Sequence, residues 1–225
     1  MTDKHEFNSQ FSMGYNDYLE GIDLSNWFRY YFIIKEVIEE KPKSILEIGV
    51  GNKIVKNCLK GLVKNYQTMD INPKLNPDIL LDLRETKLEL KEKFDCLICA
   101  EVLEHMSFSD LDKNLFNIHN YLDEKGKAII TIPHRRARFM MITPFSYYKP
   151  LIITLPVWIK SSPKLFYQQV IKNNVWIDPN HCWEIGDGKI KEKDIKESIG
   201  KAGFSIKKFK KLLHVDFFVL EKISD

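Results

Sequence analysis

The chain has 225 residues, of which 44% are hydrophobic and 29% charged, and its formal net charge is +3. This composition predicts a folded enzyme-sized chain and excludes long disorder, while the small charge neither implies nor excludes an anionic partner. The most apolar stretch, residues 151–159, is too short to span a bilayer, and residues 1–11 lack the pattern of a signal peptide. We therefore expect a cytoplasmic protein.

The amino-terminal region predicts a loosely structured lead-in followed by a helix. Residues 1–24 are polar and aromatic, with Gly14 and Gly21 as breakers. Ser25 is a plausible N-cap, and the helix after it must end before Pro42. Its apolar residues at helical spacing, which we expect to pack on a sheet, are Trp27, Tyr31, Ile34 and Ile38.

The stretch Ser44–Gly51 predicts a buried parallel strand and a tight turn. Gly49 and Gly51 allow the backbone to turn toward a helix, capped by Asn52, whose first amides point at a ligand. Glu47 lies inside the apolar run, where a carboxylate is costly to bury unless the strand's carboxyl end uses it. The stretch therefore predicts a cofactor cradle.

Strands and helices then alternate. Further strands are expected at 66–71, 78–83, 94–100 and 127–133, and a helix at 107–126, opened by a capping box of Ser107 with Asp110 and closed by Gly126. Such alternation predicts a parallel sheet covered on both faces. Asp70 stands about twenty residues beyond the glycine turn, where a carboxylate usually holds a ribose diol.

The fold class that follows is α/β. The carboxyl-terminal region predicts a helix at 192–202 and two strands at 204–212 and 215–223, joined too tightly for a crossover helix and so antiparallel. We expect a doubly wound, mostly parallel seven-stranded sheet with an antiparallel carboxyl-terminal hairpin and a lid-like insertion. Cys96 and Cys99 form a C-x-x-C inside a strand, where they point to opposite faces and serve the core.

Four features, in this order and spacing, resemble class I S-adenosylmethionine (SAM)-dependent methyltransferases. They are the Glu-x-Gly-x-Gly of residues 47–51, Asp70, the Asp-Leu of residues 82–83 and the Glu-Val-Leu-Glu-His of residues 101–105. The family usually has a third glycine where this chain has Lys53. The resemblance covers residues 44–137 and 192–222.

The resemblance implies methyl transfer with SAM as cofactor. Asp70 would hold the ribose, Asp82 would accept a hydrogen bond from the adenine amino group, and Leu83 would donate its backbone amide to the ring. The cofactor-binding residues that it implies are Glu47, Gly49, Gly51, Asp70, Ile71, Asp82, Leu83 and Glu101.

Three histidines near the strand ends are candidates for the base that removes a proton from the acceptor: His181, which is the leading candidate, His105 and His134.

Other residues are candidates for substrate binding. In the resembled family an amino-terminal segment often covers the cofactor, a role open here to Tyr15 or Tyr18. Arg135 and Arg136 follow the fifth strand, where they could clamp an anionic acceptor.

A metal site is a further alternative in the region of residues 101–105. Glu101, Glu104 and His105 stand at i, i+3 and i+4, so one helical turn would place them on one face, and His181 would complete the set. A similar pattern occurs in metal-dependent O-methyltransferases, including those that modify the 2′-hydroxyl of small RNAs. Since it is also common in methyltransferases that use no metal, we assign no metal ligand from the sequence.

The chain divides into four expected regions: an amino-terminal helical cap (1–41), a SAM-binding core (42–138), an insertion forming a substrate lid (139–183), and a helix and strands completing the core (184–225). The predicted function is O-methylation of a small metabolite or a glycan- or nucleotide-linked precursor, with nucleic acid not expected as partner. Two alternatives stay open, a metal-dependent RNA 2′-O-methyltransferase and a non-catalytic SAM-binding or scaffolding subunit.

Overall fold

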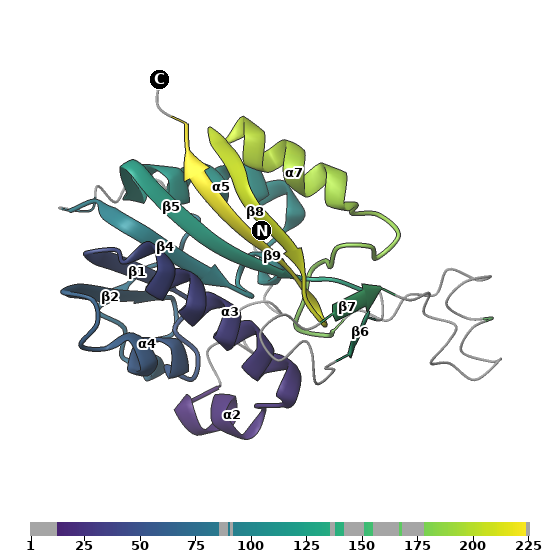
Figure 1. Ribbon diagram of the computed structural model, residues 1–225, viewed down its shortest axis with the longest axis horizontal. Coiled ribbons are helices and arrows are strands. Elements are labelled where there is room, and N and C mark those ends of the chain that lie inside the picture. Colours follow the sequence, from purple (N-terminus) through teal and green to yellow (C-terminus); the bar gives the residue numbers. More distant parts are fainter. Residues whose placement is uncertain are drawn as a thin grey trace.

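A seven-stranded sheet organises the chain in the computed structural model, which describes residues 13–85, 90, 92–135, 138–141, 151–154, 167 and 178–223. Its strands are β1 (Ser44–Ile48), β2 (Asn65–Asp70), β3 (Ile79–Leu80), β4 (Phe94–Ala100), β5 (Leu122–Pro133), β8 (Phe204–Lys211) and β9 (Val215–Lys222). The spatial order is β3-β2-β1-β4-β5-β9-β8, with β1 to β5 parallel and β9 antiparallel to both of its neighbours (Figure 1). The predicted sheet and its antiparallel hairpin are therefore confirmed.

Side chains along each strand point alternately to the two faces of the sheet, and so build one core on each face. In β4, Cys96 and Ile98 belong to one cluster of buried side chains, whereas Leu97 and Cys99 belong to the other. A strand buried on both faces needs apolar residues at every position, which is why these runs are continuous. The two cysteines serve the two cores, as predicted.

Helices cover both faces. The helices α3 (Leu24–Glu40) and α4 (Ile54–Leu59) pack on one core, and α5 (Leu111–Tyr121) and α7 (Glu192–Lys201) pack on the other. Figure 1 shows α3 crossing in front of the sheet and α5 behind it. This layering leaves the edge where the parallel strands end free for a site.

The buried face of α3 differs from the predicted one. Tyr30, Ile33 and Val37 face the core, whereas Trp27 and Tyr31 are about half exposed, at 51% and 47%. The helix carries apolar residues on several sides, so spacing alone did not select the face that meets the sheet. Its N-cap is Asp23, whose Oδ1 accepts a hydrogen bond from the Asn26 amide at 2.9 Å, and not Ser25.

Three further local predictions are corrected. A short helix, α2 (Tyr15–Glu20), interrupts the expected loose lead-in. The expected capping box at Ser107 is absent: a 3₁₀ turn, η3 (Phe108–Asp110), precedes α5, and the Ser107 side chain caps nothing. The helix also ends at Tyr121, and Gly126 lies within β5, because pairing of β5 with β4 begins at residue 122.

Most of the predicted lid, residues 139–183, lies outside the described residues. Within it, β6 (Arg138–Met141) and β7 (Leu151–Thr154) form a separate antiparallel pair. The segment from 178 onward returns to the sheet. Among the residues that the structure describes, no helix is long and apolar enough to cross a membrane.

Candidate active site

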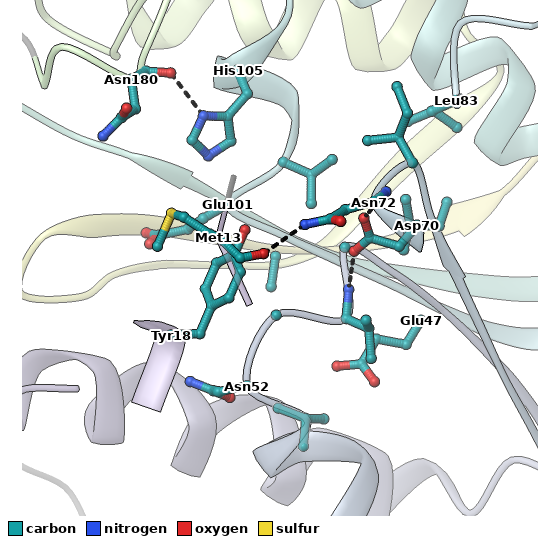
Figure 2. Close-up of a pocket in the computed structure, with 18 of the residues that line it drawn as sticks. Met13, Tyr18, Glu47, Asn52, Asp70, Asn72, Leu83, Glu101, His105 and Asn180 are labelled. Carbon is teal, nitrogen blue, oxygen red and sulfur yellow. Dashed lines mark hydrogen bonds between the residues drawn. The ribbon is translucent and has the colours of Figure 1, made fainter. Parts of the chain in front are cut away.

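A cavity of about 380 Å³ opens at the edge of the sheet where β1, β2 and β4 end. Ligands bind in this place in open α/β sheets, because the loops after the strands leave a crevice there. Figure 2 shows Tyr18 and Glu101 on one side of the cavity and Asp70 and Leu83 on the other. The predicted cofactor-binding residues all line it: Glu47, Gly49, Gly51, Asp70, Ile71, Asp82, Leu83 and Glu101.

The turn after β1 depends on its glycines. Gly49 has φ +77°, and a Cβ added there would lie 2.3 Å from Cγ2 of Val102. Gly51 has φ +44°, with its nearest neighbour, Cδ1 of Tyr18, 3.7 Å from the added Cβ. Lys53, which replaces the expected third glycine, adopts φ 57° at the N-cap of α4. The backbone thus makes the left-handed turn without a glycine at that position, at some cost in strain.

Asp70, the last residue of β2, contacts the glycine turn and also lines the cavity. Its Oδ2 accepts a hydrogen bond from the Val50 amide at 2.9 Å, and its Oδ1 accepts one from the Asn72 amide at 2.8 Å. Burial raises the pKa of Asp70, and these amides oppose that shift. Each carboxylate oxygen keeps a further lone pair, so the group can still accept from a ligand diol.

Asp82 is less available than predicted. The Nε of Arg84 lies 3.0 Å from both carboxylate oxygens of Asp82, and its Nη2 lies 2.7 Å from Oδ2. Although burial raises the pKa of Asp82, the Arg84 contacts outweigh it and hold that pKa below the usual range. A hydrogen bond from an adenine amino group to Asp82 would compete with this arginine.

Glu47 is buried in β1, beside the turn. It is 5% exposed, and its Oε2 accepts a hydrogen bond from the Tyr66 hydroxyl at 2.9 Å. Burial raises the pKa of Glu47 to about 8, against the opposing effect of that hydroxyl. Glu47 is therefore protonated at neutral pH in the free protein.

Glu101, at the end of β4, is a carboxylate of the site that is paired with cations. It forms an ion pair with the buried Arg29, and its Oε1 lies 3.3 Å from Nε2 of His214. Burial by itself raises the pKa of Glu101, but Arg29 and His214 outweigh it and hold the pKa well below its ordinary value. Its φ of 54° is rare for a residue with a side chain and turns this carboxylate toward α3.

A second group of side chains lines the cavity near Asn180 (Figure 2). His105, in the 3₁₀ turn η2 (Leu103–His105), and His181 both line the cavity, with ring centroids 5.0 Å apart. The Nδ1 of His105 lies 2.8 Å from the Asn180 carbonyl oxygen, and the Nδ1 of His181 lies 2.9 Å from Oε1 of Glu184. Two segments 75 residues apart in sequence thus meet at the cavity.

Several predicted residues lie elsewhere. Tyr15 is exposed on α2 and is not among the cavity-lining residues, whereas Tyr18 of the same helix is. His134 and Arg135 are also outside the lining, because their backbone amides bind the carbonyls of His214 and Ile185 and carry this segment past the cavity. Arg136 lies outside the described residues.

Other residues of the site had no predicted role. Arg29 and Asn72 line the cavity, and Asn72 Nδ2 donates to the Met13 carbonyl at 2.8 Å, tying the amino-terminal segment to β2 (Figure 2). Glu184 orients His181. The signal for Glu184 was its place in the stretch 178–184 beside His181, and the signal for Arg29 was an arginine among the aromatic residues of the expected helix.

Comparison with known proteins assigns the family. A family model described as a methyltransferase domain matches residues 28–206. The chain belongs to this methyltransferase family. The prediction of a class I SAM-dependent methyltransferase is confirmed, and the methyl donor of such an enzyme is SAM, the predicted cofactor. No curated protein matches the sequence significantly.

Solved structures share the fold of this methyltransferase at low sequence identity. The N-methyltransferase NodS from Bradyrhizobium japonicum WM9, in complex with S-adenosylhomocysteine (SAH), has a TM-score of 0.58 at 10% identity, covering 90% of this chain and 89% of NodS. The 1,6-didemethyltoxoflavin-N1-methyltransferase from Burkholderia thailandensis gives 0.59 at 13%, covering 100% and 92%. Magnesium protoporphyrin IX methyltransferase from Synechocystis PCC 6803 gives 0.58 at 13%, covering 88% and 84%. These likenesses concern the fold alone.

The residues present fit the cofactor. The glycine turn leaves out the side chains that would fill the cradle, and an acidic residue stands at the end of the next strand with lone pairs facing the cavity. A volume of about 380 Å³ is in the range of small-molecule sites.

Proposed function

We propose that this methyltransferase binds SAM in the cavity and methylates a hydroxyl oxygen of a small molecule, either a metabolite or a glycan- or nucleotide-linked precursor. Asp70 accepts the ribose hydroxyls, and the turn at Gly49 and Gly51 lets the methionine part approach the backbone. Leu83, which lines the cavity, would donate its backbone amide to the adenine ring. Bound SAM supplies a methyl group on a positively charged sulfur.

The observation that carries this proposal is the pair of histidines on the cavity wall. The Asn180 carbonyl only accepts hydrogen bonds, so Nδ1 of neutral His105 carries the proton and Nε2 keeps a lone pair. A carboxylate at Nδ1 of His181 has the same effect on that ring. The site therefore offers imidazole bases beside the cofactor cavity, which methylation of a hydroxyl requires and methylation of an already neutral amine does not.

The chemistry at the acceptor is a single displacement. SAM would supply the methyl group, which would pass from its sulfur to the acceptor oxygen, and Nε2 of His181 would take the hydroxyl proton. Arg29 and Glu101 hold one wall rigidly in place, which aligns the reacting atoms. The remaining task of the chain is to exclude water.

The charges of the cavity favour a small acceptor over RNA. Of the described residues that line it, the two arginines are each paired with a carboxylate, Arg29 with Glu101 and Arg84 with Asp82. A polyanion needs a series of available cations along its path. Arg135, the member of the predicted arginine clamp that the structure describes, does not line this cavity.

The experiment is a methyl-transfer assay on two acceptor pools, hydroxylated metabolites and total small RNA, with product identified by mass spectrometry and NMR. We expect an O-methyl product from the metabolite pool. His181→Gln should lower kcat roughly 100-fold while leaving the Kd for SAH unchanged, and His119→Gln, on α5 against Phe204, is the matched control. Products methylated only on nitrogen or carbon, or an RNA product alone, would refute the proposal.

A further inference from the structure

Glu104, His105 and His181 form a compact group of potential ligands at the cavity edge. One ligand atom from each of the three lies within 4.8 Å of the other two. Backbone contacts hold the two segments together: the Cys182 amide donates to the Glu104 carbonyl at 2.8 Å, and Nε1 of Trp183 donates to the Met106 carbonyl at 2.9 Å. The grouping is therefore set by the fold and does not depend on exposed side chains.

Glu104 is the unusual member. It is 0% exposed, and among the described residues neither of its carboxylate oxygens has a hydrogen-bond partner. A buried carboxyl group without a partner is costly in either protonation state, because an ionised form lacks a cation and a neutral form lacks an acceptor for its proton. Arg29, whose charge acts on Glu104, is paired with Glu101. Among the described residues, no cation forms an ion pair with Glu104.

The two histidines are oriented as metal ligands usually are. Each donates Nδ1–H to an oxygen, His105 to the Asn180 carbonyl and His181 to the Glu184 carboxylate, and each keeps Nε2 available. Metal-ligating histidines almost always make such a second hydrogen bond, because it fixes the tautomer and the ring. Glu184 is itself 6% exposed and accepts from the Asp178 amide at 3.1 Å, so it is held in turn.

We infer that Glu104, His105 and His181 bind one divalent transition-metal ion. Two imidazoles and one carboxylate suit Mn²⁺, Fe²⁺, Co²⁺ or Zn²⁺, whereas Mg²⁺ and Ca²⁺ prefer oxygen ligands alone. Three protein ligands leave positions open toward the cavity, where an acceptor could reach the ion. Glu101, which the sequence also offered as a ligand, is not one, because Arg29 and His214 engage it.

The catalytic use of such an ion rests on the proposed O-methylation, although ion binding does not. A divalent cation lowers the pKa of a hydroxyl that reaches it, so the acceptor's proton leaves to water before the methyl group is transferred. The cluster would then activate the acceptor through the ion, in place of direct proton removal by His181.

The test is a calorimetric titration of the untagged, EDTA-treated full chain with Mn²⁺, Zn²⁺ and Mg²⁺. We expect one Mn²⁺ or Zn²⁺ per chain and much weaker binding of Mg²⁺. Glu104→Gln should weaken binding roughly 100-fold, and Glu184→Gln, which only positions His181, roughly 10-fold. Glu36→Gln removes a buried carboxylate far from the cluster, paired with Lys208, and should leave ion binding unchanged.

Circular dichroism shows whether Glu104→Gln is folded, and His181→Gln serves as the second variant if it is not. Equal affinity for Mn²⁺ in wild type and either folded variant, or no binding by wild type below millimolar concentration, would overturn the inference. Full methyl transfer in EDTA would remove the catalytic role of the ion and leave the proposed function standing. A bound ion in a protein that forms no O-methyl product would support the metal site and refute the proposed function.

Discussion

The carboxylate of Asp70 accepts a hydrogen bond from the amide of Val50 at 2.9 Å, across 20 residues of sequence. This bond ties the end of β2 to the turn after β1, and the same carboxylate faces the cavity. One side chain therefore shapes the glycine turn and offers acceptor atoms to a ligand. Its two roles can be separated by substitution.

Asp70→Asn keeps one oxygen that can accept from Val50, whereas Asp70→Ala removes both acceptors. We expect both variants to lose most of their affinity for SAH, because a carboxylate binds a ribose diol through charge-assisted hydrogen bonds. Each such bond contributes about 1.5 to 3 kcal/mol. Only Asp70→Ala should also lower the free energy of unfolding, by about 1 kcal/mol. Calorimetry and urea unfolding measure the two effects, and SAH affinity equal to wild type in Asp70→Asn would contradict the ribose assignment.

Gly49→Ala should destabilise the free protein by roughly 2 to 4 kcal/mol. The added Cβ would lie 2.3 Å from Val102, and φ +77° is unfavourable for alanine. The double variant Gly49→Ala/Val102→Ala removes the steric clash. It should keep only the loss of stability caused by the left-handed backbone, about 1 to 2 kcal/mol. Thermal unfolding compares these with Gly51→Ala, where the nearest atom is 3.7 Å away. If Gly49→Ala and Gly51→Ala cost the same, the contact with Val102 is not the cause.

Lys53→Gly should retain SAH binding and raise the free energy of unfolding by up to about 1 kcal/mol. Glycine adopts the left-handed conformation of Lys53, φ 57° and ψ 14°, without strain, although it gains freedom in the unfolded chain. Lys53→Val should destabilise, because a β-branched side chain tolerates this region least. Loss of SAH binding in Lys53→Gly would indicate that the lysine side chain itself contacts the ligand.

The protonated Glu47 should make the free protein less stable as pH rises from about 5 to about 8. Burial raises its pKa to about 8, so the folded chain keeps a proton that the unfolded chain releases. Its contribution is present in full below the ordinary carboxyl pKa and lost as pH rises through about 8, by up to about 1.4 kcal/mol per pH unit.

Glu47→Gln keeps an oxygen for the Tyr66 hydroxyl and does not titrate, so it provides the comparison. The difference in free energy of unfolding between the variant and wild type, measured in urea, should grow steadily in favour of the variant over this pH range. A difference that stays constant would mean that Glu47 is already ionised in the folded protein.

Arg29→Met should cost about 3 kcal/mol of stability, because it leaves the partly buried Glu101 with His214 as its remaining ionic partner. Arg29→Met/Glu101→Gln removes both charges and should recover part of that loss. Chemical unfolding of the two single variants and the double variant yields their coupling free energy. Strictly additive effects would show that the ion pair contributes nothing beyond its separate side chains.

Predictions from sequence patterns were most reliable where the pattern lay within a single strand and its turn. The turn after β1 and the run of β4 could be placed to the residue or nearly so, because continuous apolar runs and glycines are local features. The face of α3 and the cap of α5 were wrong, since several apolar faces or several polar caps were available and tertiary packing chose among them. Tyr15 and Tyr18 looked alike in sequence, but only Tyr18 faces the cavity.

By itself, the sequence determined the sheet, the glycine turn after β1 and the membership in a methyltransferase family, because these rest on short-range patterns of apolar, glycine and acidic residues at strand ends. Tertiary structure alone decided which polar groups meet. It paired Glu101 with Arg29 and His214, and so left Glu104, His105 and His181 as the group of potential ligands, where the sequence had offered Glu101 as well. Such contacts depend on where distant loops converge, and the spacing of residues along a chain carries no information about that convergence.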